Sequence, residues 1–529
     1  MAFLDDAKKG GRVALTIVEI GLDNKLSPSG VEHHCDGQVP WGQRFFASVS
    51  AIDFAPTKLV FFDGLSHVGQ VSISFQDFNY GAGDYFARLF AMNPFYFNRE
   101  IKIHTGYVQD GFNFANFRTR LYFIKKMDYD WESRRLKITA KDLFSKVDEK
   151  GVTFPDEKRG KLKTDLSIFS PGFFLSSFAG VFPDDIFAGD PAGHYVIDKE
   201  IILVTSLIGQ LVVFRASSGT LLEEHKAGAL MRKIKVFNDR NPIDALYDIL
   251  ATSAGLGAHI DQNDWNYIRD TYTLGDYLNG VIYNPLSIKA ITKKICEQFA
   301  LNIWWDDELQ KLKIQAIGYS LSEPKKINWQ ENILNAGHSY SVDIQKAVTQ
   351  TWFYYDKIDL TKGDSSENYG ALYIYYDGNL EGEAGHRTTI IRKLYADLVG
   401  SGGLGVAVKT TSRIMARHKE GYQEITFRLD AKDTGLNVGD AVEITTVIIQ
   451  DANGNPLLRN FEVIEKEQIS DTVWQYKASY AGKTLKARLI TPNNMGNFGS
   501  ESAENKLKYM FISNNSGLMN DASEGGTIV

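Results

Sequence analysis

The sequence predicts a mainly β, multidomain fold with α+β elements, and three observations carry this prediction. The chain has 529 residues, whereas a single hydrophobic core rarely serves more than about 250–300 residues. Its hydrophobic fraction of 43% is enough to build several cores, so the chain is not disordered. It holds 32 Phe, 25 Tyr and 46 Gly but only 13 Pro, and abundant aromatic residues with frequent turns favour strands over helices.

The charge and the cysteine content argue against several classes of protein. A net charge of −7 speaks against a dedicated nucleic-acid-binding surface, although a passage that repels phosphate is compatible with it. Cys35 and Cys296 are too few for a disulfide framework, which favours a cytoplasmic site of synthesis. Residues 1–12 lack the apolar stretch of a signal peptide. The run IILVTSLIGQLVVF (201–214) is shorter than the ~20 residues that span a bilayer, so we expect two buried strands around a turn near 206–209.

The N-terminal region, residues 1–150, has the pattern of a β-rich domain. VSISFQDF (71–78) alternates apolar and polar residues, as a half-buried strand does. Residues 120–142 read as a hairpin with a polar turn at 132–134. Between them, residues 84–100 predict a short amphipathic helix that Pro94 ends.

The middle of the chain changes character twice. Residues 151–192 are rich in Gly, Pro, Asp and Phe without periodicity and predict a loop-rich insertion or linker. Residues 193–235 predict a small β unit, and residues 236–320 a small α+β domain. That domain is expected to contain a helix at 241–255, a second helix at 286–302 and a hairpin at 302–318 whose turn is Asp306–Glu308.

The stretch NPIDALYDILATSAGLG (241–257) marks the ends of its helix most clearly. Asn241 can accept a backbone hydrogen bond at the helix start, and Pro242 suits the first helical position. Asp244 places negative charge in the first turn. Gly255 and Gly257 supply the left-handed cap and the turn. The apolar stripe between these ends consists of Ile243, Leu246, Ile249 and Leu250.

The C-terminal region begins with a second β domain at 321–488, interrupted by one helix near 404–420. Its order of strands, one helix and further strands is the same as in residues 1–150, without an alignable sequence repeat. Residues 489–529 are rich in Asn, Ser and Gly and predict an extended polar tail.

Five stretches, in this order, resemble the baseplate hub, or tail-tip, proteins of tailed bacteriophages and of phage-like particles. They cover about residues 40–320, and the segment after 335 agrees in pattern with TWFYYDKIDLTKGDSSENY and GLNVGDAVEI. The resemblance weakens at 151–192 and in the tail. The five stretches are QVSISFQDF followed by FARLFAMNPFYFNREIKIHTGYV; RLYFIKKMDYDWESRRLKITAKDLF; DKEIILVTS with EEHKAGA; NPIDALYDILATSAGLG; and ICEQFALNIWWDDELQKLKIQAI.

The resemblance implies a homotrimeric ring in which each chain carries two tail-tube-like β-barrel domains, at 1–150 and 321–488. Three chains would then present six tube-like surfaces. It implies a structural virion protein at the phage tail tip, assembled in the host cytoplasm. Such a hub caps or nucleates the tail tube, adapts sixfold to threefold symmetry and lines a channel for the tape-measure protein and then DNA, which passes without specific binding. Its implied partners are tail tube and distal tail proteins, the tape-measure protein, and tail fibre or central spike proteins. The helix at 241–255 would be a rigid packing block between the barrels.

Several stretches superficially suggest chemistry, but no catalytic, cofactor-binding or metal residue is assigned. His33-His34-Cys35-Asp36 could suggest a metal site, but neighbours on an extended chain point to opposite faces and no second cluster supplies ligands, so we expect a solvated loop. GSGGLG (400–405) lacks the ending of a phosphate loop and predicts a turn and helix start. His104 and His225 stand alone and are interpreted as structural. The basic run 417–419 closes a helix and complements its dipole.

Two other functions stay open. Trp304-Trp305 beside Asp306-Asp307 resembles a carbohydrate subsite, although a hairpin turn with packed aromatic residues is the simpler interpretation. The first alternative is a receptor- or glycan-binding tip protein that uses these rings and Tyr354-Tyr355 as stacking platforms. The second is a cell-wall hydrolase, which would need two carboxyl groups held several ångströms apart across a cleft.

Overall fold

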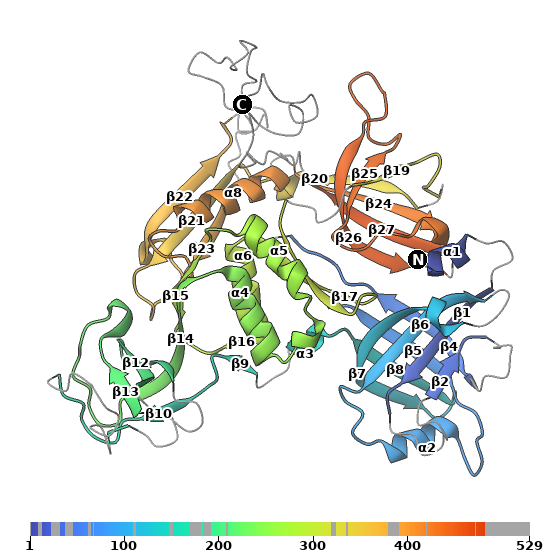
Figure 1. Ribbon diagram of the computed structural model, residues 1–529. Helices are drawn as coiled ribbons and strands as arrows, with labels where there is room; N and C mark the ends of the chain where they lie inside the picture. The colour runs from blue at the N-terminus through green and yellow to red at the C-terminus, as the bar shows by residue number, and fades with distance from the viewer. Residues whose placement is uncertain are drawn as a thin grey trace, which may run out of the picture. The chain divides into compact units, whose positions relative to one another are not determined.

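Strands that form several separate sheets predominate in the chain, which confirms the mainly β class with α+β elements (Figure 1). Among the described residues, no helix is long and apolar enough to cross a membrane. The computed structural model describes residues 2–8, 13–22, 32–37, 46–61, 65–66, 68–108, 113–147, 152–168, 181–182, 192–207, 210–318, 324–334, 337–378, 391–418, 421–470 and 472–481. The predicted tail, 489–529, lies outside the described residues.

The first sheet closes on itself and is called the first barrel. Its hydrogen-bonded order is β3-β2-β1-β6-β7-β8-β5-β4. Only Ser48 separates β3 from β4, so the first and last strands of this order are one continuous stretch of chain, 46–55. The strands are β1 (Val13–Ile20), β2 (Glu32–Cys35), β3 (Phe46–Ala47), β4 (Val49–Ala55), β5 (Gln70–Gln76), β6 (Glu100–Val108), β7 (Arg118–Asp130) and β8 (Arg135–Lys141).

The local predictions for this barrel are confirmed. Val71, Ile73 and Phe75 of β5 are fully buried, as the alternation requires. β7 and β8 form the predicted hairpin. Helix α2 (Tyr85–Met92) ends two residues before Pro94 and buries one apolar face.

We use the name second barrel for a six-stranded sheet in the order β19-β25-β26-β27-β24-β20, whose hydrogen-bonded order is open between β19 and β20. β19 pairs with β25, β20 pairs with β24, and Ile333 between them bridges Leu429 of β24, so residues 325–343 contact both ends of the order. Helix α1 (Ala2–Ala7), at the other end of the sequence, adds Phe3 and Ala7 to this barrel's core. The strands are β19 (Lys325–Asn328), β20 (Ser339–Asp343), β24 (Tyr422–Asp430), β25 (Ala441–Thr445), β26 (Arg459–Gln468) and β27 (Val473–Tyr480).

The two barrels repeat one strand order. β4-β5-β8-β7-β6 in the first corresponds to β20-β24-β27-β26-β25 in the second, and every neighbouring pair in both series is antiparallel. The register also shifts in the same pair of each series, at Ile124/Lys126 in β7 and at Val463/Glu465 in β26. A β-bulge is a specific local feature of a strand pair, so its repetition strengthens the correspondence.

The helices do not take part in this repeat, which corrects the expected equivalence of the two strand–helix–strand patterns. α2 lies between β5 and β6, whereas α8 (Leu404–His418) precedes β24 and packs on a separate three-stranded sheet. That sheet has the order β22-β21-β23, and its core is continuous with that of the α+β region. Its strands are β21 (Gln350–Lys357), β22 (Tyr369–Tyr376) and β23 (Ile391–Ala396).

The small β unit forms its own sheet in the order β10-β14-β11-β12-β13, with β15 paired to β14. The two strands predicted within residues 201–214 are confirmed as β12 and β13, and two short strands lie within the expected linker. The strands of this region are β9 (Thr153–Phe154), β10 (Arg159–Lys161), β11 (Gly193–Ile197), β12 (Glu200–Leu207), β13 (Gln210–Phe214), β14 (Leu230–Arg240), β15 (Leu278–Ile282) and β16 (Leu286–Ser287), which pairs with β9.

The described part of the α+β region contains three α-helices, α4, α5 and α6, and the hairpin of β17 (Leu301–Asp306) and β18 (Lys311–Ala316). The predicted start of α4 (Pro242–Tyr247) is confirmed, since the Asn241 side chain accepts a hydrogen bond from Ile243 N at 2.9 Å. A π-helical turn, Asp248–Ser253, continues it, and Gly255 follows in the left-handed conformation. α6 (Ile288–Gln298) is the second predicted helix.

Helix α5 (Gln262–Tyr272) was not predicted. It buries only Trp265 and Ile268, too few residues to produce a visible apolar stripe, while Asp261 caps its start. The remaining short helices are α3 (Phe144–Val147), η1 (Phe114–Asn116), η3 (Ser217–Gly219), η5 (Gly257–His259), η6 (Ile344–Lys346), η7 (Ser366–Asn368) and η8 (Ala431–Asp433).

Candidate functional site

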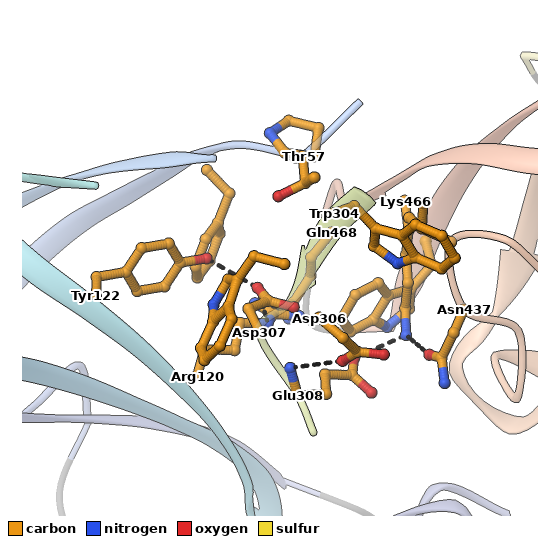
Figure 2. Close-up of a pocket in the computed structure, with 15 residues that line it drawn as sticks. Thr57, Arg120, Tyr122, Trp304, Asp306, Asp307, Glu308, Asn437, Lys466 and Gln468 are labelled. Carbon is orange, nitrogen blue, oxygen red and sulfur yellow. Dashed lines mark hydrogen bonds and ion pairs between the residues drawn. The ribbon is translucent and has the colours of Figure 1, made fainter. Parts of the chain in front are cut away.

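The tip of the β17–β18 hairpin lies between the two barrels and carries a cluster of charges, which we call the junction (Figure 2). The small pocket beside it has a volume of about 40 Å³, room for about three water molecules. The junction comprises Asp306, Asp307 and Glu308 of the hairpin, Arg118, Arg120 and Tyr122 of β7, and Lys466 and Trp474 of the second barrel.

The hairpin presents its carboxylates because its turn is fixed locally. Asp306 Oδ1 accepts hydrogen bonds from Glu308 N at 3.1 Å and Leu309 N at 2.9 Å, an arrangement typical of aspartate in turns. Trp304 and Trp305 are adjacent in β17, so their side chains point to opposite faces of the strand. They are 2% and 1% exposed and belong to two different hydrophobic cores. Packing on both faces of the strand therefore holds the tip in place.

Glu308 pairs with both barrels. Lys466 Nζ lies 2.7 Å from its carboxylate, and Arg118 Nη1 lies 3.5 Å from it. Burial alone would raise the pKa of Glu308, but the positive charges of Lys466, Arg118 and Arg120 outweigh it and lower that pKa to about 2. Lys466 also donates a hydrogen bond to Asn437 Oδ1 at 3.0 Å.

Arg120 makes a second link. Its Nε lies 3.6 Å from Asp307, and its Nη1 donates a hydrogen bond to Gln468 of the second barrel at 3.3 Å. The guanidinium carbon is 4.6 Å from the ring centroid of Phe54 and 4.9 Å from that of Trp474, which is a favourable cation–π arrangement. One arginine of β7 thus contacts the hairpin and both barrels.

The junction is suited to holding elements together rather than to chemistry on a substrate. Burial, with the nearby charge of Asp307, raises the pKa of Asp306 to about 6, a value that by itself would fit a general acid. However, Asp306 is engaged in its own turn, and the pocket is far smaller than the ~300–1,000 Å³ typical of ligand sites. Three cations facing three carboxylates form a balanced ionic cluster.

The aromatic residues proposed as stacking platforms are buried. Besides the two tryptophans, Tyr354 and Tyr355 are only 5% and 7% exposed. A ring must offer a free face to stack on a sugar. These four rings pack in the interior, in agreement with the simpler interpretation of a hairpin turn and strand aromatics.

The His33–Asp36 segment is not a solvated loop, so that expectation is wrong. Residues 32–35 form β2, in which His34 and Cys35 are 0% and 1% exposed. His34 packs among aromatic rings of the first barrel, with its Nδ1 2.8 Å from Ser48 Oγ. His33 lies on the opposite face of the strand, near Glu19. Aromatic packing and hydrogen bonds, among them those that the Cys35 thiol donates to the carbonyls of Gly37 and Phe46, make burial of these polar side chains possible. No group of three metal-ligating side chains occurs in the described part of the chain.

The basic run at 417–419 ends α8, as predicted, with Arg417 and His418 in the last turn of the helix. Arg417 is buried, pairs with Glu462 of β26 and lies 3.6 Å from the ring centroid of Phe61. Burial, with the charges of Arg392 and Arg417, lowers the pKa of His418 to about 4, so this ring is neutral at pH 7. Lys419 lies outside the described residues.

The other candidates, which were interpreted as structural, lie in the following surroundings. The GSGGLG stretch forms the turn before α8, which begins at Leu404. His104 is buried beside Thr119 and Glu19. His225 places Nε2 2.9 Å from Glu200 and Nδ1 2.8 Å from Asp198, within a buried network completed by Arg215.

The sequence pointed to the hairpin turn but not to its partners. Arg118 and Arg120 stand two residues apart in a strand and therefore share a face. That spacing was the available signal. The sequence around Lys466 contains no such signal, because only the tertiary structure brings this residue to the hairpin.

No protein-family model matches the chain, and a search of curated proteins gives no match either. Among solved structures, the chain is similar to the tail protein from Neisseria meningitidis MC58, with a TM-score of 0.43 and 10% identity over 88% of this chain and 96% of that one. It is similar to the 43 kDa tail protein of prophage MuSo2 from Shewanella oneidensis, with a TM-score of 0.42 and 9% identity over 89% and 99%. The prophage tail protein gp18 from Listeria monocytogenes EGD-e gives a TM-score of 0.36 and 10% identity over 88% and 95%. Over most of its length the chain is thus similar to tail proteins, two of them from prophages.

Proposed function

We propose that this chain is a structural protein of a phage-type tail, the trimeric hub at the tail tip, and that it is not an enzyme. The observation that carries the proposal is the repeated strand order of the two barrels, including the bulge in the same strand pair. A chain with two barrels of one topology lets three copies present six similar surfaces. Such a ring matches a sixfold tube on one side and a threefold tip on the other.

In this proposal the barrels are the tail-tube-like domains, within residues 1–150 and 321–488. The linker at 151–192, the β unit at 193–235 and the α+β domain at 236–320 connect them. We expect the helix at 241–255 to act as a rigid packing block between the barrels. In support of this, α4 packs on α5 and α6 within a large core that also contains Phe123 of β7 and residues of β21. The hub would cap or nucleate the tube and line a channel for the tape-measure protein and DNA, contacting distal tail proteins and fibre or spike proteins.

The junction supports a mechanical role within the hub. Glu308 of the hairpin contacts both barrels, and Arg120 of the first barrel contacts both the hairpin and the second barrel. In this proposal the hairpin tip therefore fixes the angle between the barrels. A symmetry adaptor needs this angle to be constant, because each barrel must meet an equivalent tube subunit.

The mass of the purified chain in solution, alone and with tail tube protein, tests the proposal. We expect the mass of three chains, either alone or on addition of tube protein. Electron microscopy of particles carrying an antibody to this chain should place the label at the tail tip. A chain that stays monomeric with tube protein, together with a label elsewhere on the particle, would overturn the proposal.

A further inference from the structure

Strand β22 has one packed side and one exposed side. Helix α8 lies against β21 and β22 (Figure 1), and Ala371 and Tyr373 of β22 pack on the large core there. On the opposite side, Leu372, Ile374 and Tyr376 are 43%, 42% and 65% exposed. Three exposed apolar side chains in a row on one strand form a patch, and such patches mark interaction surfaces more often than scattered exposed residues do.

β22 is also an end strand that lacks the usual protection against pairing. Within the described residues it pairs only with β21, so its second edge has no described partner. Its eight residues, YGALYIYY, include no charge and no proline, and its pairing with β21 runs without a register shift. Natural edge strands are usually short or carry a charge, a proline or a bulge that prevents pairing with another chain.

The end strands of the other open sheets, and the opposite end of the same sheet, are shorter or charged. β23 carries Arg392 and Lys393, and β19 carries Lys325 and Lys326. β10 has three residues, β20 has five and includes Asp343, and β13 is uncharged but has five residues. The length of β22 and its lack of charge therefore indicate that another strand covers it in the assembled protein.

The side-chain sizes along β22 fit an antiparallel copy of the same strand. Gly370 and Ala371 lie near its start, and Tyr375 and Tyr376 end it. If two copies run antiparallel with Tyr373 on the two-fold axis, Gly370 of each copy lies opposite Tyr376 of the other, and Ala371 lies opposite Tyr375. Each small residue then faces a large ring, and directly opposite residues are the pairs that stabilise a sheet.

We propose that β22 pairs antiparallel with β22 of a second copy of this chain and joins two three-stranded sheets into one. In this register Leu372 of each copy lies opposite Ile374 of the other on the exposed face. The contact is two-fold, because each copy contributes the same strand. It does not depend on the proposed trimer. A two-fold contact cannot close within a threefold ring, so it doubles whatever unit the chain forms, from one chain to two or from three to six.

Two charge variants of the full-length protein test the contact. One combines Leu372→Lys with Ile374→Lys, and the other combines Leu372→Glu with Ile374→Glu, so that like charges face each other in either variant alone. Sedimentation velocity of the unchanged protein should show its mass doubling as the concentration rises. Each variant alone should need at least about tenfold higher concentration to double, whereas an equimolar mixture of the two should double as the unchanged protein does.

A matched control separates this contact from general surface effects. Leu230→Lys combined with Ile469→Lys changes two side chains outside β22 that are each 44% exposed, and it should leave the doubling unchanged. All these variants should keep the thermal midpoint of unfolding, because the substituted side chains are exposed. The mass of the charge variants alone reports on the trimer, so the trimer and the strand pairing can fail separately.

Photo-cross-linking identifies the strand that covers β22. With benzoylphenylalanine at position 374 we expect a product of two chains in which the linked peptide contains residues 369–376 of the second copy. The same probe at position 469 should give no such product. A mass that does not change with concentration, charge variants that associate as the unchanged protein does, a mixture that fails to associate, or a link to another part of a second copy overturns the proposal.

Two further outcomes would overturn self-pairing by assigning β22 another partner. Cross-linking from position 374 within the same chain would mean that a segment outside the described residues covers the strand. Cross-linking to purified tail tube protein, with loss of the two-chain product, would assign the strand to a partner protein.

Discussion

Replacing Glu308 by glutamine should destabilise the protein measurably at neutral pH. The pKa of Glu308 falls from 4.5 to about 2 in the folded chain, and each pKa unit corresponds to about 1.4 kcal/mol, so the charge contributes about 3 kcal/mol. Its side chain is only 16% exposed, so solvent screens little of this contribution. Because the folded-state pKa is lowered, the contribution is complete above pH 4.5 and is lost as the pH falls towards 2. At pH 3 less than half of it remains.

Thermal unfolding followed by tryptophan fluorescence measures this effect, since Trp304, Trp305 and Trp474 line the junction pocket. We expect the midpoint of Glu308→Gln to lie about 6–12 °C below that of the unchanged protein at pH 7, at about 2–4 °C per kcal/mol for a large domain. The gap should shrink by more than half at pH 3. Glu367→Gln, at an exposed glutamate, is the matched control and should leave the midpoint unchanged. A gap below about 2 °C at pH 7, or one that stays constant with pH, would refute the assignment of Glu308 as the charge that joins the barrels.

Three other predictions concern single sites. Gly439→Ala should cost about 2–4 kcal/mol of unfolding free energy, because φ is +90° and the new Cβ would lie 2.6 Å from the buried ring of Trp304. The control Gly454→Ala, at φ +81° in open space, should cost about 1 kcal/mol. Equal losses of unfolding free energy in urea titrations of the two variants would contradict this prediction. Trp305→Ala should cost about 3–5 kcal/mol because the side chain is 1% exposed, and Trp131→Ala, at a tryptophan 71% exposed, should cost almost nothing in the same assay. Burial lowers the pKa of His225, but hydrogen bonds to two carboxylates outweigh it and raise that pKa, so its contribution to stability is complete below pH 6.5 and decreases as the pH rises through the raised value. An NMR titration of the ring that gives an ordinary or lowered pKa would disprove this prediction.

The parts of the fold that local chemistry determines were predictable from the sequence. The helix starting at Asn241 was found because its cap, its first-turn proline and its closing glycine are all local signals. Strand β5 was found because one of its faces is fully buried and the other is not. The hairpin turn at Asp306 was found because aspartate forms such turns with its own backbone.

The parts that tertiary contacts determine were missed or misinterpreted. Strand β2 looked like a solvated loop, because nothing local shows that aromatic rings from distant strands surround His34. Helix α5 buries too few apolar residues to be visible as a periodic pattern. The junction depends on Lys466, which is 158 residues away from Glu308. No local pattern encodes a contact of that kind.

The N-terminal helix has a consequence for how the chain is made and handled. Phe3 belongs to the core of the second barrel, its ring centroid lies 5.2 Å from that of Tyr107 in the first barrel, and the guanidinium carbon of Arg118 lies 3.9 Å from its ring centroid. During synthesis, residues 2–7 can therefore complete their packing only after strands hundreds of residues further along the chain have been made. A substitution at Phe3 would therefore act on both barrels, because α1 packs against η8 of the second barrel and against β6 and η1 of the first.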